Sequence, residues 1–426
     1  MCLVLPCSDY NDGEMVKKLQ AHAADLRGVN RLAIDGIAGV IDLVEAMHDN
    51  IASVPGILRG RKPGRTTGIT GLVYRSIRGV LGGVGHGLDR ALAQLELLLM
   101  ARVGPLAGEQ RRPGRDALLA ALNGVLGDYL AASNNPLAIT MRLRWRGVAL
   151  PDHREALAAA IPQAGGKLVV LLHGLCMNDR LWKRKGHDHG AALARDLAYT
   201  PVYLHYNSGL HVSVNGRAFA DLLEALVKIW PVPLTGLVLV GHSMGGLVAR
   251  SACHYGGLAR HEWLRRLDKL VFIGTPHHGA PLERGGNWVD VLLGATRYSA
   301  PLARLGKIRS AGITDLRFGN LVDEDWNQRD RFARSRDRRV PVPLPDGVAC
   351  YDIAATTGKA AGDLPDRLIG DGIVPLASAL GQHANPRLAL SFDASRQWVA
   401  YGTNHLDLLS RPAVYAQLRR WLAGTD

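Results

Sequence analysis

A serine stands directly after an apolar run, in a pattern that can support nucleophilic catalysis. Residues 237–240 are typical of a buried strand, and the segment Gly241-His242-Ser243-Met244-Gly245 follows at once. A serine between a strand and a helix in Gly-x-Ser-x-Gly sits on a sharp turn that exposes its hydroxyl. The glycines relieve crowding at this turn, and the following helix N-terminus favours developing negative charge. We therefore predict Ser243 to be a nucleophile.

A nucleophilic serine needs a base to take its proton and a carboxylate to orient the base. When a strand–turn–helix carries the serine, the chain order is serine, acid, histidine. His405 lies between the last predicted strand and the last predicted helix, at the edge of the sheet that carries the serine. We predict His405 to be the base; the alternative is a surface histidine.

The predicted acid is Asp371, which stands between two glycines in Gly370-Asp371-Gly372. Flanking glycines permit a tight turn that aims the carboxylate inward. The alternative for Asp371 is a turn aspartate that binds its own backbone. The other candidates for the acid, from the predicted strand 349–354 onward, are Asp352, Asp363, Asp366 and Asp393.

Two backbone amides must stabilise the oxyanion that forms when a serine attacks a carbonyl. One is expected just after the nucleophile, which is Met244, and the other in the loop after the first strand of the fold. That strand ends in Leu172-His173-Gly174-Leu175, and we predict the Leu175 amide to be the second donor. His173 is predicted to hold this loop rather than to act as a base.

A long insertion, residues 279–345, separates two predicted strands and lies near the predicted site. Its apolar segment around Trp288 can form a mobile lid over an acyl pocket. A packed cap of fixed shape explains the same residues equally well. His277 and His278 precede the insertion. We predict His277, His278 and Trp288 to contact the substrate.

Strands and helices alternate through the second part of the chain. The predicted strands are residues 167–172, 202–205, 237–240, 270–273, 349–354 and 398–401, and the clearest helices are 216–229, 246–254 and 412–422. This alternation predicts an α/β fold with a mostly parallel sheet and helices on both faces. We assign residues 151–426 to this catalytic domain.

Residues 1–150 have a different, helical pattern. Apolar residues recur at helical spacing within 34–51, 77–99 and 118–130, with prolines between these segments. The second segment is rich in glycine, follows a basic stretch and has no acidic residue between positions 51 and 88. Such a stretch can bind an anionic membrane or a lipid surface, whereas a small packed helical domain is the simpler interpretation.

Composition fits a globular protein, with 47% hydrophobic and 21% charged residues among 426. The net charge of +13 is compatible with an anionic partner or with an arginine-rich surface that binds nothing specific. Because no nucleic-acid-binding motif is present, we predict no nucleic-acid partner.

Five widely spaced cysteines do not form a disulfide framework, which favours a reducing compartment. The first residues make a poor secretory signal, and no apolar run suits a transmembrane helix. We therefore predict a cytoplasmic protein, with peripheral attachment to a membrane or lipid inclusion left open. No cofactor and no metal ion are predicted.

From about residue 165 onward, the chain resembles the α/β-hydrolase superfamily, and within it the bacterial lipase and GPI-inositol-deacylase-like (PGAP1-like) branch. The motifs that carry this resemblance are Leu172-His173-Gly174-Leu175, Gly241-His242-Ser243-Met244-Gly245-Gly246, Gly274-Thr275-Pro276-His277-His278-Gly279, Asp371-Gly372-Ile373-Val374-Pro375 and Asn404-His405-Leu406-Asp407. The resemblance implies hydrolysis of carboxylic esters, often of acyl lipids. In some similar bacterial lipases, a calcium-binding aspartate follows the catalytic histidine by two residues, which corresponds to Asp407.

These observations predict a serine esterase or lipase that works through Ser243, His405 and Asp371. Two alternatives stay open at this point. An acyltransferase would use the same acyl-enzyme with an alcohol acceptor instead of water. A lipid-, membrane- or polymer-surface-binding protein would act through its N-terminal helices, with the hydrolase domain secondary.

Overall fold

The computed structural model divides the chain into two units. One contains Met1–Gln110 and Ala132–Leu137, and the other contains Arg111–Ala131 and Ala138–Asp426. The structure describes residues 23–36, 75–76, 78–79, 82–84, 86–94, 113–280, 310–330, 336–360 and 370–424. The predicted division into domains at residue 150 stays a prediction.

The first unit is helical where it is described, which confirms the predicted helical N-terminal region. Residues 23–36 form a helix, and Arg31 on it lies 2.7 Å from Asp89 on a second helical segment. Arg27 lies 2.9 Å from the same carboxylate. Hydrogen bonds and charge from these arginines, Arg31 first, lower the pKa of Asp89 to about 2. No helix of the described residues is both long and apolar enough to cross a bilayer.

The second unit is built on an eight-stranded sheet, in the order β2-β1-β4-β3-β5-β6-β7-β8. Its strands are β1 (Arg142–Trp145), β2 (Val148–Ala149), β3 (Lys167–Leu172), β4 (Thr200–His205), β5 (Gly236–His242), β6 (Leu267–Ile273), β7 (Ala349–Ala355) and β8 (Gln397–Ala400). The six neighbouring strands β4, β3, β5, β6, β7 and β8 are parallel to one another. β1 pairs antiparallel with β2 and with β4. The predicted mostly parallel sheet is confirmed.

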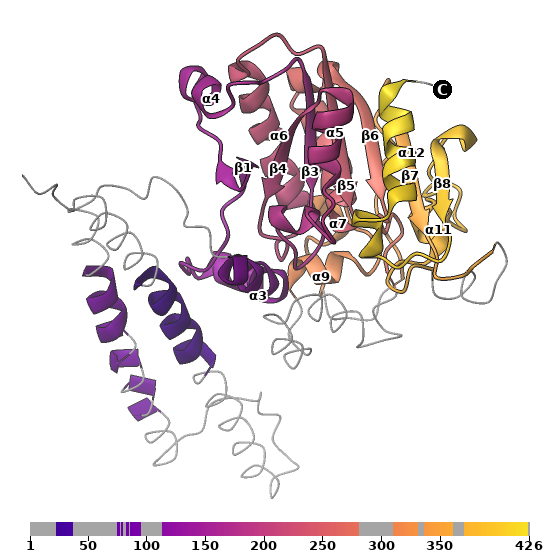
Figure 1. Ribbon diagram of the computed structural model, residues 1–426. Coiled ribbons are helices and arrows are strands. Elements are labelled where there is room, and N and C mark those ends of the chain that lie inside the picture. Colours follow the sequence, from indigo (N-terminus) through magenta and orange to yellow (C-terminus); the bar gives the residue numbers. More distant parts are fainter. Residues whose placement is uncertain are drawn as a thin grey trace, which may run out of the picture. The chain divides into compact units, whose positions relative to one another are not determined.

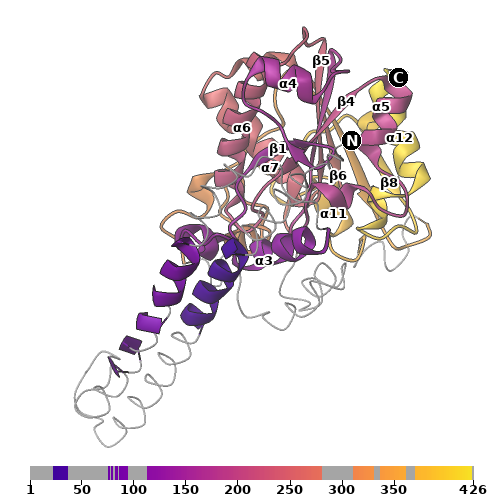
Figure 2. The same ribbon diagram turned by 60° about the vertical axis from the view of Figure 1, so that its left-hand side comes forward.

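Helices connect these strands and pack around them. The α-helices are α3 (Pro113–Ala132), α4 (Arg154–Ala160), α5 (His189–Leu197), α6 (Val212–Ile229), α7 (Met244–Leu258), α9 (Ala311–Asp315), α11 (Leu376–Ala379) and α12 (Pro412–Ala423). Short 3-10 helices are η1 (Asp179–Trp182), η2 (Glu262–Arg266), η5 (Asp323–Asp325), η6 (Ala394–Arg396) and η7 (Asp407–Leu409). Figure 2 shows α6 and α7 on one side of the strands and α5 and α12 on the other. Both faces of the sheet are therefore covered, as predicted.

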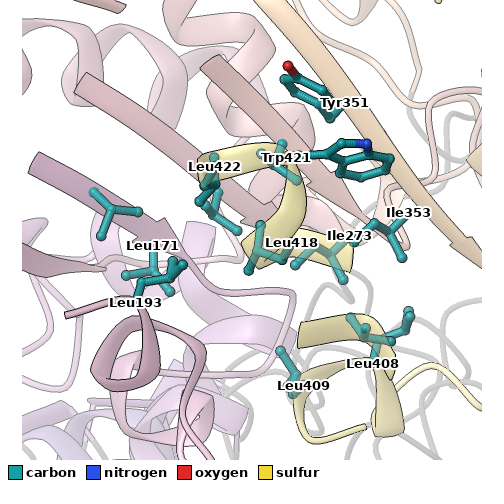
Figure 3. Close-up of a cluster of buried hydrophobic side chains, with 14 of the residues drawn as sticks. Leu171, Leu193, Ile273, Tyr351, Ile353, Leu408, Leu409, Leu418, Trp421 and Leu422 are labelled. Carbon is teal, nitrogen blue, oxygen red and sulfur yellow. The ribbon is translucent and has the colours of Figure 1, made fainter. Parts of the chain in front are cut away.

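The central strands form because their residues are apolar on both faces of the pleat. Every residue from Leu168 to Leu172 in β3 is fully buried, and so are the apolar residues of β5. The residues of β3 and β5 that face α5 and α12 belong to one core cluster with Ile273, Ile353 and Trp421. Figure 3 shows this cluster, in which Leu418 and Trp421 of α12 lie close to Ile273 and Tyr351 of the sheet.

Two strands were not predicted from the sequence. β1 and β2 lie within residues 1–150, and β1 carries Arg142 and Arg144, charged residues that are uncommon in a buried strand. Arg144 is buried nonetheless, because its guanidinium donates a 2.9 Å hydrogen bond to Asp179. α3 also belongs to the second unit, and Figure 1 shows it with α9 beyond the carboxyl ends of the strands.

The described part of the insertion is fixed by buried polar contacts. Asp325 accepts hydrogen bonds from the amides of Leu321 and Val340, which connects residues 321–325 to Val340. Arg339 donates to the carbonyl of His277 at 3.0 Å. Residues 310–330 and 336–345 are therefore connected to one another and to His277, whereas residues 281–309, with Trp288, lie outside the described residues, so the packed cap stays a prediction. The lid stays a prediction.

Candidate active site

Ser243 lies on a strained turn between β5 and α7. Its φ and ψ are 54° and −125°, a conformation that non-glycine residues rarely adopt. Such a conformation costs about 1–3 kcal/mol and persists only where the surroundings enforce it. The amide of Ser243 donates a 2.9 Å hydrogen bond to the carbonyl of Ile273 at the end of β6. The turn is thus held against the neighbouring strand, with the serine at the N-terminus of a helix.

The glycines of this motif are required because backbone passes where side chains would stand. A Cβ built on Gly241 would lie 2.5 Å from Cα of Gly246. A Cβ on Gly245 would lie 2.3 Å from the carbonyl oxygen of Leu172, at the end of β3. Neither contact leaves room for a methyl group. The glycines therefore permit the first turn of α7 to approach both β5 and β3.

Asp371 and His405 form a buried hydrogen-bonded pair. Nδ1 of His405 donates to Oδ2 of Asp371 at 2.6 Å, and both side chains are at most 2% exposed. The other oxygen of Asp371 accepts the amides of Ile373 and Val374 at 3.0 and 2.8 Å. Asp371 thus binds its own turn with one oxygen and orients His405 with the other.

The ring of His405 lies next to the turn that carries Ser243. A Cβ on Gly274 would come within 3.3 Å of this ring, and Gly274 directly follows the Ile273 that binds Ser243. The His242 ring lies 4.8 Å from it, centroid to centroid. Buried Leu408 anchors the loop after His405 in the core cluster (Figure 3). Within the described residues, Nε2 of His405 has no hydrogen-bond partner.

His242, which directly precedes Ser243, is fully buried. Burial, together with the nearby His405, holds the pKa of His242 well below its ordinary value of 6.5. Its Nε2 lies 3.2 Å from the carbonyl oxygen of His405. A neutral His242 can donate to this carbonyl and so help to fix the position of the His405 backbone.

Of the predicted oxyanion donors, Met244 directly follows Ser243, and Leu175 lies in a loop that approaches Ser243. Met244 is the first residue of α7, so its amide has no acceptor within the helix. A Cβ on Gly174, which precedes Leu175, would lie 3.0 Å from Cβ of Ser243. Among backbone hydrogen bonds in the described loops, none is donated by the Leu175 amide. The role of these two amides stays a prediction.

His173 holds the loop after β3, as predicted. Its Nδ1 lies 2.9 Å from the carbonyl oxygen of Gly174, and its ring stacks on Tyr206 at 4.3 Å. Burial lowers the pKa of His173 to about 3, so the ring is neutral at physiological pH. A neutral ring can donate to the carbonyl without carrying a charge into the interior.

His277 lies in a buried polar cluster with Arg250 and Asp352. Its Nδ1 is 3.3 Å from Arg250, and its Nε2 is 4.0 Å from Asp352. Burial raises the pKa of Asp352 well above its ordinary value and lowers that of Arg250 to about 9. His278 is less buried and lies 3.3 Å from Arg339. Contact of His277 and His278 with a substrate stays a prediction.

Asp407, the residue that corresponds to a calcium ligand in similar lipases, is hydrogen-bonded to other side chains of this protein. Asp407 accepts a 2.7 Å hydrogen bond from Nζ of Lys185 and one of 2.8 Å from Nδ2 of Asn404. Within the described residues, no group of three or more histidine, cysteine or acidic side chains is arranged to hold a metal ion. Since Ca²⁺ needs six to eight oxygen ligands, this arrangement does not fit the calcium site that the resemblance implies.

A chelator should therefore not alter the activity that the predicted Ser243, Asp371 and His405 would support. We expect EDTA, and added CaCl₂ after dialysis, to alter ester turnover by less than about twofold, because Lys185 supplies the positive charge beside Asp407. The measurement is initial velocity with a soluble ester. A loss of about tenfold or more that calcium restores would show that a metal ion braces the His405 loop.

Residues 163–340 match the family model described as a PGAP1-like alpha/beta domain. This region is therefore similar to the PGAP1-like alpha/beta domain. The matched residues of the PGAP1-like domain include Ser243, Met244 and Leu175, whereas Asp371 and His405 follow the matched region. The α/β-hydrolase resemblance seen in the sequence is thereby confirmed.

Several solved structures are similar to the chain that contains this PGAP1-like domain. The mature form of lipase BlEst2 from Bacillus licheniformis has 17% identity and a TM-score of 0.39, over 60% of this chain and 91% of that one. The product of gene lin2722 from Listeria innocua has 15% identity and a TM-score of 0.34, over 61% and 94%. Phospholipase PlaB from Legionella pneumophila, solved with thio-NAD, has 15% identity and a TM-score of 0.31, over 50% and 44%. A sequence search of curated proteins found no match.

One element beside the PGAP1-like domain was not predicted to belong to the site. α3 contacts the loop that carries Leu175, through Gly124 and Cys176. The only sequence signal was the spacing of Gly124 and Gly127 within an apolar helix, which permits close approach of other backbone. Without the tertiary partner, the same glycines simply lower helix propensity.

Proposed function

We propose that this protein is a serine hydrolase that cleaves carboxylic esters through Ser243, His405 and Asp371. The observation that carries the proposal is the buried 2.6 Å hydrogen bond between His405 and Asp371. It leaves Nε2 of His405 unpartnered within the described residues, beside the turn that carries Ser243. A base oriented in this way can accept a proton from a serine hydroxyl.

In the proposed reaction, Oγ of Ser243 attacks the ester carbonyl while Nε2 of His405 takes the hydroxyl proton. Asp371 keeps the proton of His405 on Nδ1 and stabilises the imidazolium that forms. The amides of Met244 and Leu175 bind the oxyanion of the tetrahedral intermediate, each contributing about 10²–10³ in rate. His405 then protonates the leaving alcohol, and an acyl-enzyme remains.

The second half of the reaction releases the acid. Nε2 of His405 takes a proton from water, and the resulting hydroxide attacks the acyl carbonyl through the same oxyanion site. Collapse of the second tetrahedral intermediate returns the proton from His405 to Oγ of Ser243. An acyltransferase would differ only in using an alcohol in place of this water.

Acyl lipids are the substrate class that we propose, on the strength of the family resemblance. The net charge of +13 favours electrostatic attraction to an anionic lipid surface. We propose that the protein attaches peripherally to such a surface. The free, buried Cys176, Cys253 and Cys350 suit a reducing compartment, and we propose the cytoplasm. No nucleic-acid partner is proposed.

A chain-length series of p-nitrophenyl esters tests the proposed reaction, and phospholipid vesicles test the substrate class. We expect kcat/KM of about 10⁴ M⁻¹ s⁻¹ or more for the preferred ester. Products analysed with and without added alcohol separate hydrolysis from acyl transfer. Absence of turnover across the whole series and with phospholipid would contradict the proposal, and ester products that replace the free acid would favour the acyltransferase.

A further inference from the structure

The middle of α3 is buried around its whole circumference. All residues from 120 to 127 are buried, including the polar side chain of Asn123. A helix on the surface of a domain normally buries only one face. Asn123 accepts the amide of Ile139 at 2.8 Å and donates to the carbonyl of Leu119 at 2.9 Å. α3 is therefore built into the second unit and is not an appended element.

Two glycines bring α3 against the loops that follow β3 and β4. A Cβ built on Gly124 would lie 2.2 Å from Sγ of Cys176 and 2.8 Å from its Cα. A Cβ on Gly127 would lie 1.9 Å from Oδ1 of Asn207. Neither position tolerates a side chain unless a loop moves. The helix thus rests directly on the backbone next to Leu175.

Cys176 is held in a rare conformation by these contacts. Its φ is 58°, which non-glycine residues seldom adopt. Its amide donates a 3.0 Å hydrogen bond to Oγ of Ser208, in the loop after β4. Cys176 directly follows Leu175, so the position of Cys176 restricts the direction of the Leu175 peptide.

α9 and the residue before it contact both α3 and the loop of Ser208. Ser310, which precedes α9, donates from Oγ to the carbonyl of Gly124 at 2.6 Å. A Cβ on Gly312 would lie 2.1 Å from the carbonyl oxygen of Ser208 and 2.9 Å from Cε of Met244. α3, the loop of Ser208 and α9 are therefore in contact with one another, next to Cys176 and the side chain of Met244.

We propose that Gly124 and Ser208 are positioning residues for the oxyanion site, acting through Cys176 on the Leu175 amide. This inference rests on the proposed function. Because Gly124 has no side chain, the loop that carries Cys176 can pack directly against α3. The hydroxyl of Ser208 accepts a hydrogen bond from the Cys176 amide and so fixes its position. The catalytic unit then begins at α3, ahead of the PGAP1-like region, because the alignment of a catalytic amide depends on this helix.

Two substitutions in the full-length chain test this inference. Gly124→Ala adds a methyl group that displaces the Cys176 loop, and we expect kcat to fall 10- to 100-fold while KM changes less than threefold. Ser208→Ala adds no atoms and removes only the acceptor, and we expect kcat to fall about tenfold. Gly257→Ala is the matched control, because Gly257 also lies in a helix but has nothing within 4 Å of its Cβ position.

A trifluoromethyl ketone provides a readout that loss of folded protein alone would not give. Its hemiketal oxygen occupies the oxyanion site, so its Ki should rise in both variants in proportion to the loss in kcat/KM. Circular dichroism and active-site titration correct for inactive protein. If both corrected variants keep kcat and Ki within twofold of the wild type, the inference is wrong. Ester turnover by the wild type and its dependence on Ser243 test the proposed function separately.

Discussion

Replacement of Ser243 by alanine is expected to lower kcat for ester hydrolysis by about 10⁴-fold or more, with little change in KM. Alanine removes the only proposed nucleophile, and its small side chain adds no atoms to the turn. The residual rate would come from the oxyanion donors and from binding. Initial velocities with the preferred p-nitrophenyl ester give both constants.

Ser251→Ala is the matched control for this substitution. Ser251 lies on the same helix, α7, and is also buried, but its hydroxyl donates to the carbonyl of Leu321 at 2.7 Å. We expect kcat of this variant within threefold of the wild type. If Ser243→Ala retained more than a tenth of the wild-type kcat, Ser243 would not be the nucleophile.

Replacement of Asp371 by asparagine is expected to lower kcat by about 10⁴-fold. An asparagine amide can donate to Nδ1 of His405, which would then carry no proton and leave the proton on Nε2. Nε2 could not take the proton of Ser243 in that tautomer. The loss should appear in kcat more than in KM, and the measurement is the same ester assay.

Asp352→Asn is the control, because Asp352 is a buried aspartate on β7 that does not contact His405 in the described residues. We expect kcat to fall far less than in Asp371→Asn, because Asp352 lies near His277 and not against His405. We also expect a change in stability whose sign follows from the pKa of Asp352. Since burial raises the pKa of Asp352, its contribution to stability is present below about pH 4 and is lost as pH rises through the folded-state pKa.

Asparagine does not titrate, so Asp352→Asn should gain stability relative to the wild type as pH rises. Urea unfolding at pH 5 and pH 8 measures this difference. An equal loss of activity in Asp352→Asn and Asp371→Asn would contradict the assignment of the acid. A stability difference that shrinks with rising pH would contradict the raised pKa of Asp352.

Much of the parallel sheet could be predicted because buried parallel strands are continuous apolar runs. Residues 167–172 coincide with β3, and each of the other five predicted strands overlaps an observed one. β1 could not be predicted, since its buried Arg144 is paired with Asp179, 35 residues away. A tertiary ion pair of this kind leaves no local signal.

The relation between Asp371 and His405 was predictable because chain order and flanking glycines restrict the choice of acid and base. The pairing of Lys185 with Asp407 was not, because the two residues are 222 positions apart and neither belongs to a motif with fixed spacing. The contact of α3 with Cys176 was missed for a related reason. Glycines in a helix indicate close packing only when the partner is known.

Labelling with a fluorophosphonate, followed by peptide mass spectrometry, tests the central claim most directly. Only a serine activated by a neighbouring base, beside oxyanion donors, should react rapidly with this reagent. We predict one phosphonyl group per chain, on Ser243, with loss of ester turnover in the same proportion as labelling. Labelling of another residue, or full inactivation while Ser243 stays unmodified, would contradict Ser243 as the nucleophile.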